Sequence, residues 1–268
     1  MTGHRPRKRF GQHFLIDRAC IARIIAAIQP EPDDLMVEIG PGLGALTEPL
    51  SQLVGHLQVV EIDRDIAQEL QRRFAPERVT IHRADALEFD FAALGPGLRV
   101  VGNLPYNISS PLLFRIASVS ARVRDCHFML QREVVDRMAA APGSKTYGRL
   151  SVMIQYRFQV EKLLNVPAGA FRPLPKVESA FVRLVPQASL PLQAADERLF
   201  GAIVAKAFSQ RRKTLRNALA EFVSEAELAQ LGVEARLRPE NLSVETFVRL
   251  AQFAANRASR HAAGTISA

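Results

Sequence analysis

Four consecutive residues offer the most specific chemistry in this chain: Asn103, Leu104, Pro105 and Tyr106. The side-chain carbonyl of Asn103 can accept a hydrogen bond from an N–H group, and the Tyr106 ring offers a flat face for stacking. Pro105 fixes its own φ and biases Leu104 toward an extended backbone, so the neighbouring carbonyls point in set directions. Two oxygen acceptors beside an aromatic ring suit a planar amine such as the exocyclic amine of adenine. The alternative is an asparagine-capped turn with a half-buried tyrosine.

A glycine-rich loop at residues 40–45 follows the apolar run 35–39. Glycine lets the backbone turn tightly and approach a ligand closely, because no Cβ is in the way. The loop satisfies the G-x-G-x-x-G/A pattern of dinucleotide sites, and Glu61 stands 19 residues after Gly42 (61 minus 42), where a ribose-binding acid is expected. The pattern fits a nicotinamide site as well as an S-adenosylmethionine site, and a turn without any ligand is the third interpretation.

A second acid, Asp85, follows the apolar run 79–81. A carboxylate at this point could accept a hydrogen bond from the adenine amine of a bound cofactor. An aspartate in the same position could equally well be the N-cap of a helix. The residue alone therefore leaves both interpretations open.

Apolar runs alternate with helical patterns from residue 18 to about residue 135. The predicted strands are residues 35–39, 57–62, 79–81, 98–101 and 126–130, and the predicted helices between them include residues 46–53 and 65–74. This alternation predicts βαβ units and a parallel sheet with both faces covered. The candidate site residues follow predicted strands, which is the edge where open α/β sheets bind ligands. Residues 151–160 and 177–185 are predicted as late strands, an antiparallel pair at one edge.

The C-terminal part of the chain has a different pattern. Residues 186–195 are small, polar and proline-containing, which is typical of a linker. From residue 196 onward the apolar residues fall at helical spacing, with helices predicted around residues 200–208, 215–222 and 244–253 and a frayed tail beyond Asn256. The sequence thus predicts one α/β domain at residues 1–185, a linker at 186–195 and a helical domain at 196–268.

The composition points to a nucleic-acid partner inside a reducing compartment. The 268 residues carry a formal net charge of +8, which favours a polyanionic partner. The two cysteines lie far apart without C-x-x-C spacing, so we expect a cytoplasmic protein with no metal site. No apolar stretch approaches the roughly 18 residues of a membrane span. The basic residues near the N-terminus are interpreted as an arm rather than a transit peptide.

Basic residues gather in three places that could contact phosphates. The largest group is predicted to share one helical turn at residues 211–216, opposite Leu215 and Leu219, with Lys206 just before it. The candidates are Arg7, Lys8 and Arg9 in the arm, Lys145 and Arg149, and Lys206, Arg211, Arg212, Lys213 and Arg216. We predict salt-sensitive RNA binding through them, and a solvated helix face is the alternative.

Taken in order, these features resemble the KsgA/RsmA-type ribosomal RNA adenine dimethyltransferases. The resemblance covers nearly the whole chain and is carried by residues 7–15, 37–44, 60–63, 84–87, 103–111, 145–151 and 171–180. It implies an α/β fold, a Rossmann-like class I methyltransferase sheet that is mostly parallel with an antiparallel edge strand. A small all-helical C-terminal domain would follow this sheet.

The resemblance also implies the ligands and the reaction. The cofactor is S-adenosylmethionine, with contacts expected from Gln12, His13, Leu15, Gly40, Gly42, Glu61, Asp85, Ala86 and Asn103. The family often has asparagine where this chain has His13, which leaves open whether the contact there is made by side chain or backbone. The usual reaction is dimethylation of two adjacent adenosines in a hairpin near the 3′ end of small-subunit (16S) ribosomal RNA. The implied partner is this RNA or the pre-30S particle, with the enzyme acting as a monomer.

We hypothesise that Asn103 Oδ1 and the Leu104 carbonyl accept the N–H bonds of the target amine. Accepting these bonds frees a lone pair that is otherwise delocalised into the adenine ring. Tyr106 and Phe171 would hold the ring on its two faces, since a flipped base loses its stacking partners. Phe171 is the family-matched candidate for the second face, and a core residue under a proline loop is the alternative.

Three other functions share part of this evidence. An Erm-type methyltransferase would act on large-subunit RNA, but those relatives tend to have isoleucine where this chain has Leu104. A nucleic-acid-binding factor related to mitochondrial transcription factor B would not need Glu61, Asp85 and Asn103 together. A nicotinamide enzyme would leave residues 103–106 and the basic residues unexplained.

Overall fold

The computed structural model describes residues 13–105, 108–190, 194–210 and 213–265. The chain forms two compact units: Met1–Val135 with Phe158–Pro186, called here the sheet unit, and Asp136–Arg157 with Gln187–Ala268, called the helical unit. The predicted domains end at residue 185, close to this division. The difference is at residues 136–157, which belong by their contacts to the helical unit and not to the α/β domain in which the sequence pattern placed them.

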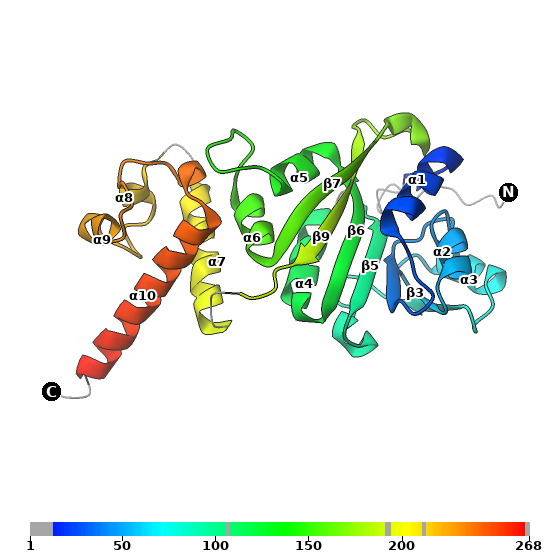
Figure 1. Cartoon of the computed structure of the whole chain (residues 1–268), viewed down its shortest axis with the longest axis horizontal. Coiled ribbons are helices and arrows are strands. Elements are labelled where there is room, and N and C mark those ends of the chain that lie inside the picture. The colour runs from blue at the N-terminus through cyan, green and yellow to red at the C-terminus, as the bar shows by residue number, and fades with distance from the viewer. Residues whose placement is uncertain (1–12, 106–107, 191–193, 211–212, 266–268) are drawn as a thin grey trace. The chain divides into compact units, whose positions relative to one another are not determined.

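The sheet unit is built on a seven-stranded sheet with the order β4-β3-β2-β5-β6-β9-β7 (Figure 1). Its strands are β2 (Met36–Ile39), β3 (Leu57–Glu61), β4 (Val79–Arg83), β5 (Leu98–Asn103), β6 (Val123–Gln131), β7 (Phe158–Val166) and β9 (Ser179–Pro186). The first five pair in parallel, and β9 runs antiparallel to both of its neighbours. The predicted parallel sheet with an antiparallel pair at one edge is confirmed.

The central strands are mostly apolar, as expected for a parallel sheet with both faces covered, and Glu38 on β2 and Arg99 on β5 are buried exceptions. The helices of this unit are α1 (Arg18–Ile28), α2 (Thr47–Leu53), α3 (Arg64–Arg73), α4 (Ser109–Ser118) and α5 (Arg132–Met138), the last of which ends beyond Val135. Short 3-10 turns lie at Phe91–Leu94, Ser120–Arg122 and Ala168–Ala170. The predicted helices at residues 46–53 and 65–74 are confirmed as α2 and α3. Aspartates at positions 17 and 63 cap α1 and α3 by accepting backbone N–H bonds.

A second, two-stranded sheet joins the N-terminal segment to a late loop. Strand β1 (Phe14–Leu15) pairs antiparallel with β8 (Phe171–Arg172), with Phe14 opposite Arg172 and Leu15 opposite Phe171. The amides of Ile16 and Asp17 then both donate to the Ala170 carbonyl, at 2.9 and 3.3 Å. This pairing fixes the residues just before α1 against the segment that leads into β9.

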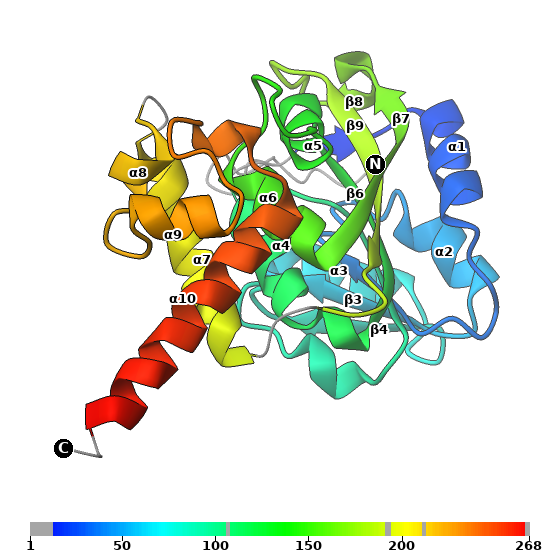
Figure 2. The same cartoon turned by 60° about the vertical axis from the view of Figure 1, so that its left-hand side comes forward.

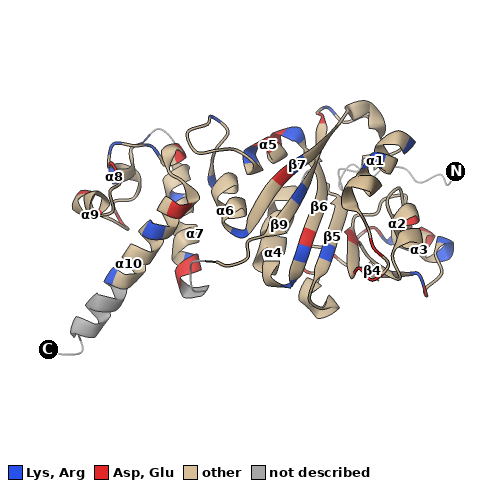
Figure 3. Cartoon of the chain, viewed as in Figure 1, with Lys and Arg blue, Asp and Glu red and all other residues tan. Residues whose placement is uncertain are grey.

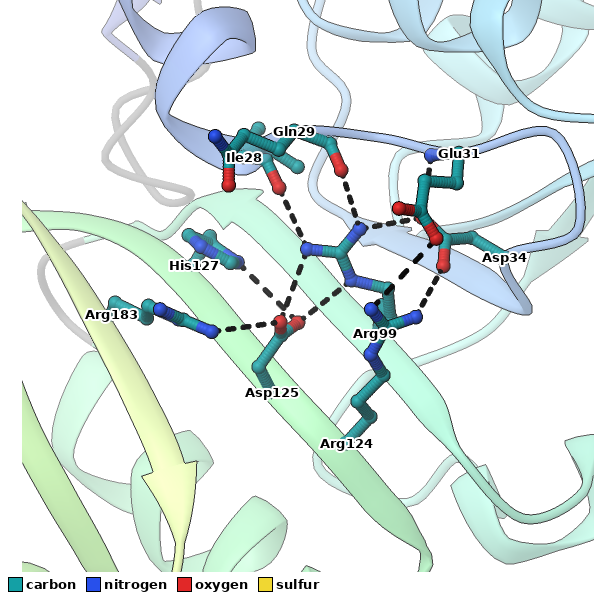
Figure 4. A network of polar contacts seen from close by, with 9 residues as sticks. All are labelled: Ile28, Gln29, Glu31, Asp34, Arg99, Arg124, Asp125, His127 and Arg183. Atoms are coloured by element: carbon teal, nitrogen blue, oxygen red, sulfur yellow. Dashed lines mark hydrogen bonds and ion pairs between the residues drawn. The ribbon is translucent and has the colours of Figure 1, made fainter.

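Buried charges tie α1 to the middle of the sheet (Figure 4). The Arg99 guanidinium, on β5, donates to both carboxylate oxygens of Asp125 at 3.0 and 3.1 Å and to Asp34 at 2.5 Å. It also donates to the final carbonyls of α1, those of Ile28 at 2.7 Å and Gln29 at 3.0 Å. All five N–H groups of the guanidinium are thereby satisfied, as a buried arginine requires.

Asp125 carries a negative charge in this network. Burial opposes ionisation of Asp125, but the neighbouring His127 and Arg99 outweigh burial and lower its pKa to about 2. The carboxylate is therefore ionised at any pH where the protein functions. Arg99 anchors the C-terminal end of α1 at one end of β5, and Asn103 is the last residue at the other end of the same strand.

Residues 151–157 are helical, so the predicted strand 151–160 is wrong over most of its length. Helix α6 (Arg149–Arg157) occupies this segment, and β7 begins only at Phe158. Val152, Ile154 and Tyr156 alternate with less apolar residues, which imitates the period of a strand. Val152 and Tyr156 are also four residues apart, and in the helix both pack into the core of the helical unit. There the Tyr156 ring centroid lies 4.6 Å from that of Phe200.

The helical unit also contains α7 (Ala194–Ser209), α8 (Leu215–Ala218), α9 (Glu225–Gln230), a 3-10 turn (Pro239–Asn241) and α10 (Val244–Thr265). Helix α10 packs against α7 (Figures 1 and 2). The helix predicted around 215–222 is shorter than expected, because α8 ends at Ala218. Helix α10 continues to Thr265 instead of fraying beyond Asn256, which agrees with the alanine-rich sequence there. The predicted linker, residues 186–195, includes the last residue of β9 and the first two residues of α7, and residues 191–193 lie outside the described part of the chain.

Candidate active site

One cavity of about 140 Å³ opens where the parallel strands of the sheet unit end. Ten residues predicted from the sequence line it: His13, Leu15, Gly40, Gly42, Glu61, Asp85, Ala86, Asn103, Leu104 and Pro105. They come from β1, from the loops after β2 and β4 and from the ends of β3 and β5. The carboxyl edge of the sheet therefore gathers residues that are up to 92 positions apart in the chain (105 minus 13).

The glycine loop needs glycine at its turns. Gly40, Gly42 and Gly44 have positive φ values of 66°, 56° and 85°, a region that residues with a Cβ rarely adopt. At Gly42 a Cβ would also lie 2.9 Å from a ring carbon of Phe14. Strand β1 thus packs directly on the loop, and the loop presents bare backbone to the cavity.

Glu61 is a buried carboxylate at the end of β3. Only 6% of its surface is exposed, and its Oε1 accepts a hydrogen bond from the Asp63 amide at 2.7 Å. Burial raises the pKa of Glu61 to about 7, against the lowering effect of backbone N–H groups that include Asp63 and Gly42. A carboxylate with this pKa can be ionised by a ligand that donates hydrogen bonds to it.

Glu38 is a cavity residue to which the sequence pattern assigned no role. Its carboxylate is 1% exposed and accepts a hydrogen bond from Thr47 Oγ1 at 2.6 Å. Burial raises the pKa of Glu38 to about 8, Thr47 acts in the opposite direction, and Glu61 raises it further. The available signal was an acid inside the apolar run 35–39, since an isolated charge in a buried parallel strand is rare.

Asp85 lines the cavity from a turn and not from the start of a helix. Its Oδ1 accepts from the Leu87 amide at 2.9 Å, and its backbone carbonyl accepts from the amides of Glu88 and Phe89. Residues 86–88 form a turn, and no helix lies between β4 and the 3-10 turn that starts at Phe91. Asp85 is therefore not a helix N-cap, and the residue lines the cavity.

Asn103 bonds across the sheet unit to the N-terminal segment. Its Nδ2 donates to the backbone carbonyl of His13 at 3.0 Å. A carbonyl oxygen can only accept, so the amide nitrogen must face His13 and Oδ1 must point the other way. Leu104, the next residue, is fixed by its amide, which donates to Met129 at 3.1 Å. This long-range bond replaces the local capped turn that was the alternative for Asn103.

Phe171 is a core residue in this structure, contrary to its expected role as a face for the target base. It has no exposed surface and packs in the hydrophobic cluster with Phe14, Leu15 and Phe181. Its side chain is fixed inward by the pairing of β8 with β1, and it does not line the cavity. A base could reach this ring only after β1 and β8 separate.

Several predicted residues lie outside the described part of the chain. These are Arg7, Lys8, Arg9, Gln12, Tyr106, Arg211 and Arg212. Their predicted roles stay predictions.

The described basic candidates all belong to the helical unit, where Figure 3 marks Lys and Arg in blue. Lys145, Arg149, Lys213 and Arg216 are exposed, Lys206 pairs with Glu221 at 2.8 Å, and Arg216 lies 3.6 Å from Glu225. Helix α8 starts only at Leu215, so Lys213 lies before the helix and does not share a helical turn with Arg216 as predicted, while Arg211 and Arg212 lie outside the described residues.

Two further arginines join this basic group through backbone contacts. The Leu215 amide donates to Leu237 at 2.8 Å and the Arg216 amide to Ala235 at 3.2 Å, which places residues 213–216 beside 235–238. Arg236 and Arg238 are exposed. We call Lys213, Arg216, Arg236 and Arg238 the basic edge. The sequence pattern missed Arg236 and Arg238, because nothing local indicated that their loop pairs with the start of α8.

The described residues contain no cluster of three or more His, Cys, Asp or Glu side chains that could hold a metal ion. Among the helices described, none is long and apolar enough to cross a membrane.

Comparisons with known proteins agree with this geometry. The family model described as ribosomal RNA adenine dimethylase matches residues 3–256. The ribosomal RNA small subunit methyltransferase A of Aromatoleum aromaticum is 57% identical over 260 residues, which cover 97% of this chain and 98% of that protein. The protein of the same name from Chromobacterium violaceum is 54% identical over 97% of this chain and 100% of its own length.

Two solved structures share the fold over most of the chain. A dimethyladenosine transferase from Plasmodium falciparum superposes with a TM-score of 0.77 at 28% identity, covering 89% of this chain and 96% of that one. The 23S rRNA methyltransferase ErmE superposes with a TM-score of 0.70 at 26% identity, covering 89% and 98%. The identity to the small-subunit enzymes is about twice the identity to ErmE.

Proposed function

Because this chain belongs to the ribosomal RNA adenine dimethylase family, we propose that it dimethylates two adjacent adenosines in small-subunit (16S) ribosomal RNA. The target is a hairpin near the 3′ end of that RNA, and the acceptor atoms are the exocyclic amines. The observation that carries the proposal is the Asn103 amide, which is fixed by His13 at the mouth of a cavity containing the glycine loop, Glu61 and Asp85. The function is that of an S-adenosylmethionine-dependent methyltransferase.

The cavity fits S-adenosylmethionine. The glycine loop leaves a cradle that a Cβ would fill, Glu61 offers an acceptor for ribose hydroxyls, and Asp85 offers one for an adenine amine. Leu43 and Ile62, which are 40% and 47% exposed, add apolar surface to the lining of the cavity. When bound, the cofactor supplies a methyl group activated by a sulfonium.

Asn103 and Leu104 activate the amine. Their two carbonyl oxygens accept the N–H bonds of the adenine amine and draw its nitrogen toward tetrahedral geometry, so the lone pair becomes available as a nucleophile. Orientation of this kind can lower a barrier by ~7–11 kcal/mol. The second methylation must proceed with one N–H fewer, so one of the two acceptors then acts alone. Tyr106 remains the proposed stacking face, and Phe171 is not part of the proposal.

The basic edge supplies RNA affinity in the helical unit. Within the described residues, Lys213, Arg236 and Arg238 form no ion pair with an acid, so their charges are available to phosphates. Shape and phosphate contacts, not base reading, are expected where the RNA is duplex. We propose that the partner is the pre-30S particle and that the enzyme acts as a monomer in the cytoplasm.

Two alternatives keep specific support. The first alternative is a large-subunit substrate, because ErmE shares the fold. The sequence identity to ErmE is lower than the identity to the small-subunit methyltransferases, which weighs against this alternative. A non-catalytic RNA-binding factor on the same fold is disfavoured, because Glu61, Asp85 and Asn103 line one cavity.

One assay tests the function. Labelled S-adenosylmethionine is incubated with unmethylated small and large ribosomal subunits, and the modified nucleoside is identified. We expect label in small subunits as dimethyladenosine, and labelling that is slower by about 10²–10³-fold with Asn103→Ala. Label confined to large subunits would overturn the proposed small-subunit substrate. No transfer to either subunit would overturn the proposed methyltransferase activity.

A further inference from the structure

His13 joins two segments that frame the cavity. Its ring Nδ1 lies 2.8 Å from the carbonyl oxygen of Pro173, and its own backbone carbonyl accepts the Asn103 amide at 3.0 Å. One residue therefore contacts the loop after β8 with its side chain and the proposed amine-binding asparagine with its backbone.

The ring contact lies at the end of the β1–β8 ladder. In the β1–β8 register, Phe14 lies opposite Arg172, so the next pair along the antiparallel ladder is His13 and Pro173. Because Ile16 donates to Ala170, this next pair is a non-hydrogen-bonded one, in which the missing N–H of proline costs no backbone bond. The His13 ring adds a side-chain bond to the proline carbonyl and extends the contact between the two segments by one residue.

The hydrogen bond to Pro173 also defines which nitrogen of the His13 ring carries a proton. The Pro173 carbonyl can only accept, so the hydrogen must reside on Nδ1 of His13. This holds for the neutral ring and for the imidazolium, because both can carry a proton on that atom.

We propose that His13 is a positioning residue: its ring, held on Pro173, places the His13 carbonyl that orients the Asn103 amide. With the carbonyl in place, Asn103 turns Nδ2 toward it and Oδ1 toward the target amine. Without it, the Asn103 amide can rotate by half a turn and present a donor, which repels the N–H groups of the substrate. The inference rests on the proposed function, since it assigns the orientation of the group that activates the amine.

The test compares two substitutions that differ in one property. In His13→Asn, the side-chain amide can donate to Pro173 from near the position of Nδ1. In His13→Asp, a carboxylate of the same shape can only accept and is repelled by the Pro173 carbonyl. His56→Asp is the matched control, because the Nδ1 of His56 also contacts a backbone carbonyl, that of Glu77 at 3.0 Å, away from the cavity.

We expect His13→Asp to lower kcat by about 10²-fold, the scale of a small misplacement of a catalytic group. His13→Asn should restore most of that loss, and His56→Asp should leave kcat unchanged. Cofactor affinity, measured by calorimetry, and the melting temperature are recorded for each variant. A structural role alone would move the melting temperature of both aspartate variants and would not separate His13→Asn from His13→Asp in kcat.

A nitrogen-15 NMR spectrum of the unaltered protein gives a readout independent of activity. The neutral His13 ring should carry its proton on Nδ1, and His13→Asn identifies the signal by its loss. An unprotonated Nδ1, equal kcat in the two His13 variants, or full kcat in His13→Asp would each overturn the inference. Full kcat in Asn103→Ala would instead overturn the proposed role of Asn103, whatever the His13 variants do.

Discussion

Thr47 donates a hydrogen bond to the buried carboxylate of Glu38, with 2.6 Å between their oxygens. The pair lies behind the glycine loop, and Glu61 is the second buried acid of the same cavity. The sheet unit therefore holds two carboxyl groups whose pKa values are raised to about 8 and about 7. Because both values fall near neutral pH, proton binding should affect the stability of the fold and the affinity of the site.

The ligand-free protein should lose stability through Glu38 as the pH rises from about 4.5 to about 8. The folded state keeps the Glu38 proton over this range, whereas the unfolded chain has released it. The stability is fully present below the unfolded pKa and declines by up to ~1.4 kcal/mol per pH unit for one proton. Denaturant unfolding between pH 5 and pH 8 measures this decline, and Glu38→Gln should remove the Glu38 contribution and leave the smaller decline due to Glu61. A constant difference between the two proteins at every pH would contradict the prediction.

Cofactor affinity should rise with pH through about 7. In the proposed site, ribose hydroxyls would donate to Glu61 most strongly when it is ionised, so binding would remove the proton that burial retains. Below this pKa the affinity should fall by up to about tenfold per pH unit. Calorimetry at pH 6 and pH 8, in buffers with different ionisation enthalpies, measures the affinity and the released proton. Glu61→Gln should bind the cofactor weakly and lack this pH dependence. Equal cofactor affinities of the unaltered protein at the two pH values would refute the prediction.

Asn103→Ala should lower kcat by about 10²–10³-fold, the usual effect of removing one preorganised group at a reacting centre. Cofactor affinity should change far less, because the acceptor faces the target amine in the proposal. Single-turnover kinetics with saturating cofactor, together with calorimetry, separate the two quantities. A kcat near that of the unaltered enzyme would exclude Asn103 from amine activation.

Gly42→Ala should destabilise the sheet unit by about 1–3 kcal/mol and weaken cofactor binding. The residue has a φ of +56°, and the new Cβ would lie 2.9 Å from Phe14. Gly97→Ala is the matched control, since Gly97 has a φ of +76° and nothing within 4 Å of the added atom. The Gly97→Ala control measures the loss of stability that the positive φ alone causes. Equal losses of stability in the two variants would show that contact with Phe14 contributes nothing.

Replacing Arg236 and Arg238 by alanine should reduce the salt dependence of RNA affinity. Each lost phosphate contact lowers the slope of log K against log salt by about 0.9 for duplex, so the double variant should lose about twice that value. The control is Arg72→Ala with Arg122→Ala, which removes the same charge from exposed positions of the sheet unit. Filter binding of a 16S hairpin at several salt concentrations measures the slopes. Equal slopes for the two double variants would exclude the basic edge from RNA contact.

The glycine loop and the strands could be predicted from the sequence because their signals are local. The acid at the end of β3 and the asparagine at the end of β5 follow buried runs, and parallel strands bring such ends to one edge. Helix α6 was misread because Val152 and Tyr156 fit the spacing of a helix while their neighbours imitate the alternation of a strand. Over so short a segment, packing of Tyr156 against Phe200 decides between helix and strand.

Contacts between distant segments could not be predicted. The bond between His13 and Asn103 joins residues 90 positions apart, and no property of either residue indicates the other. The burial of Phe171 follows from its pairing with Leu15, which is likewise a non-local event. Arg236 and Arg238 were missed for the same reason.

The short ladder between β1 and β8 has a consequence for the timing of biosynthesis. His13 and Pro173 are 160 residues apart, so a ribosome adding 5–20 residues per second needs on the order of 10 s to make the second after the first. Until then the N-terminal segment lacks its strand partner β8, and only its contacts with residues such as Gly42 and Asn103 can form. The segment that carries His13 is therefore held on both sides only after most of the sheet unit has been synthesised.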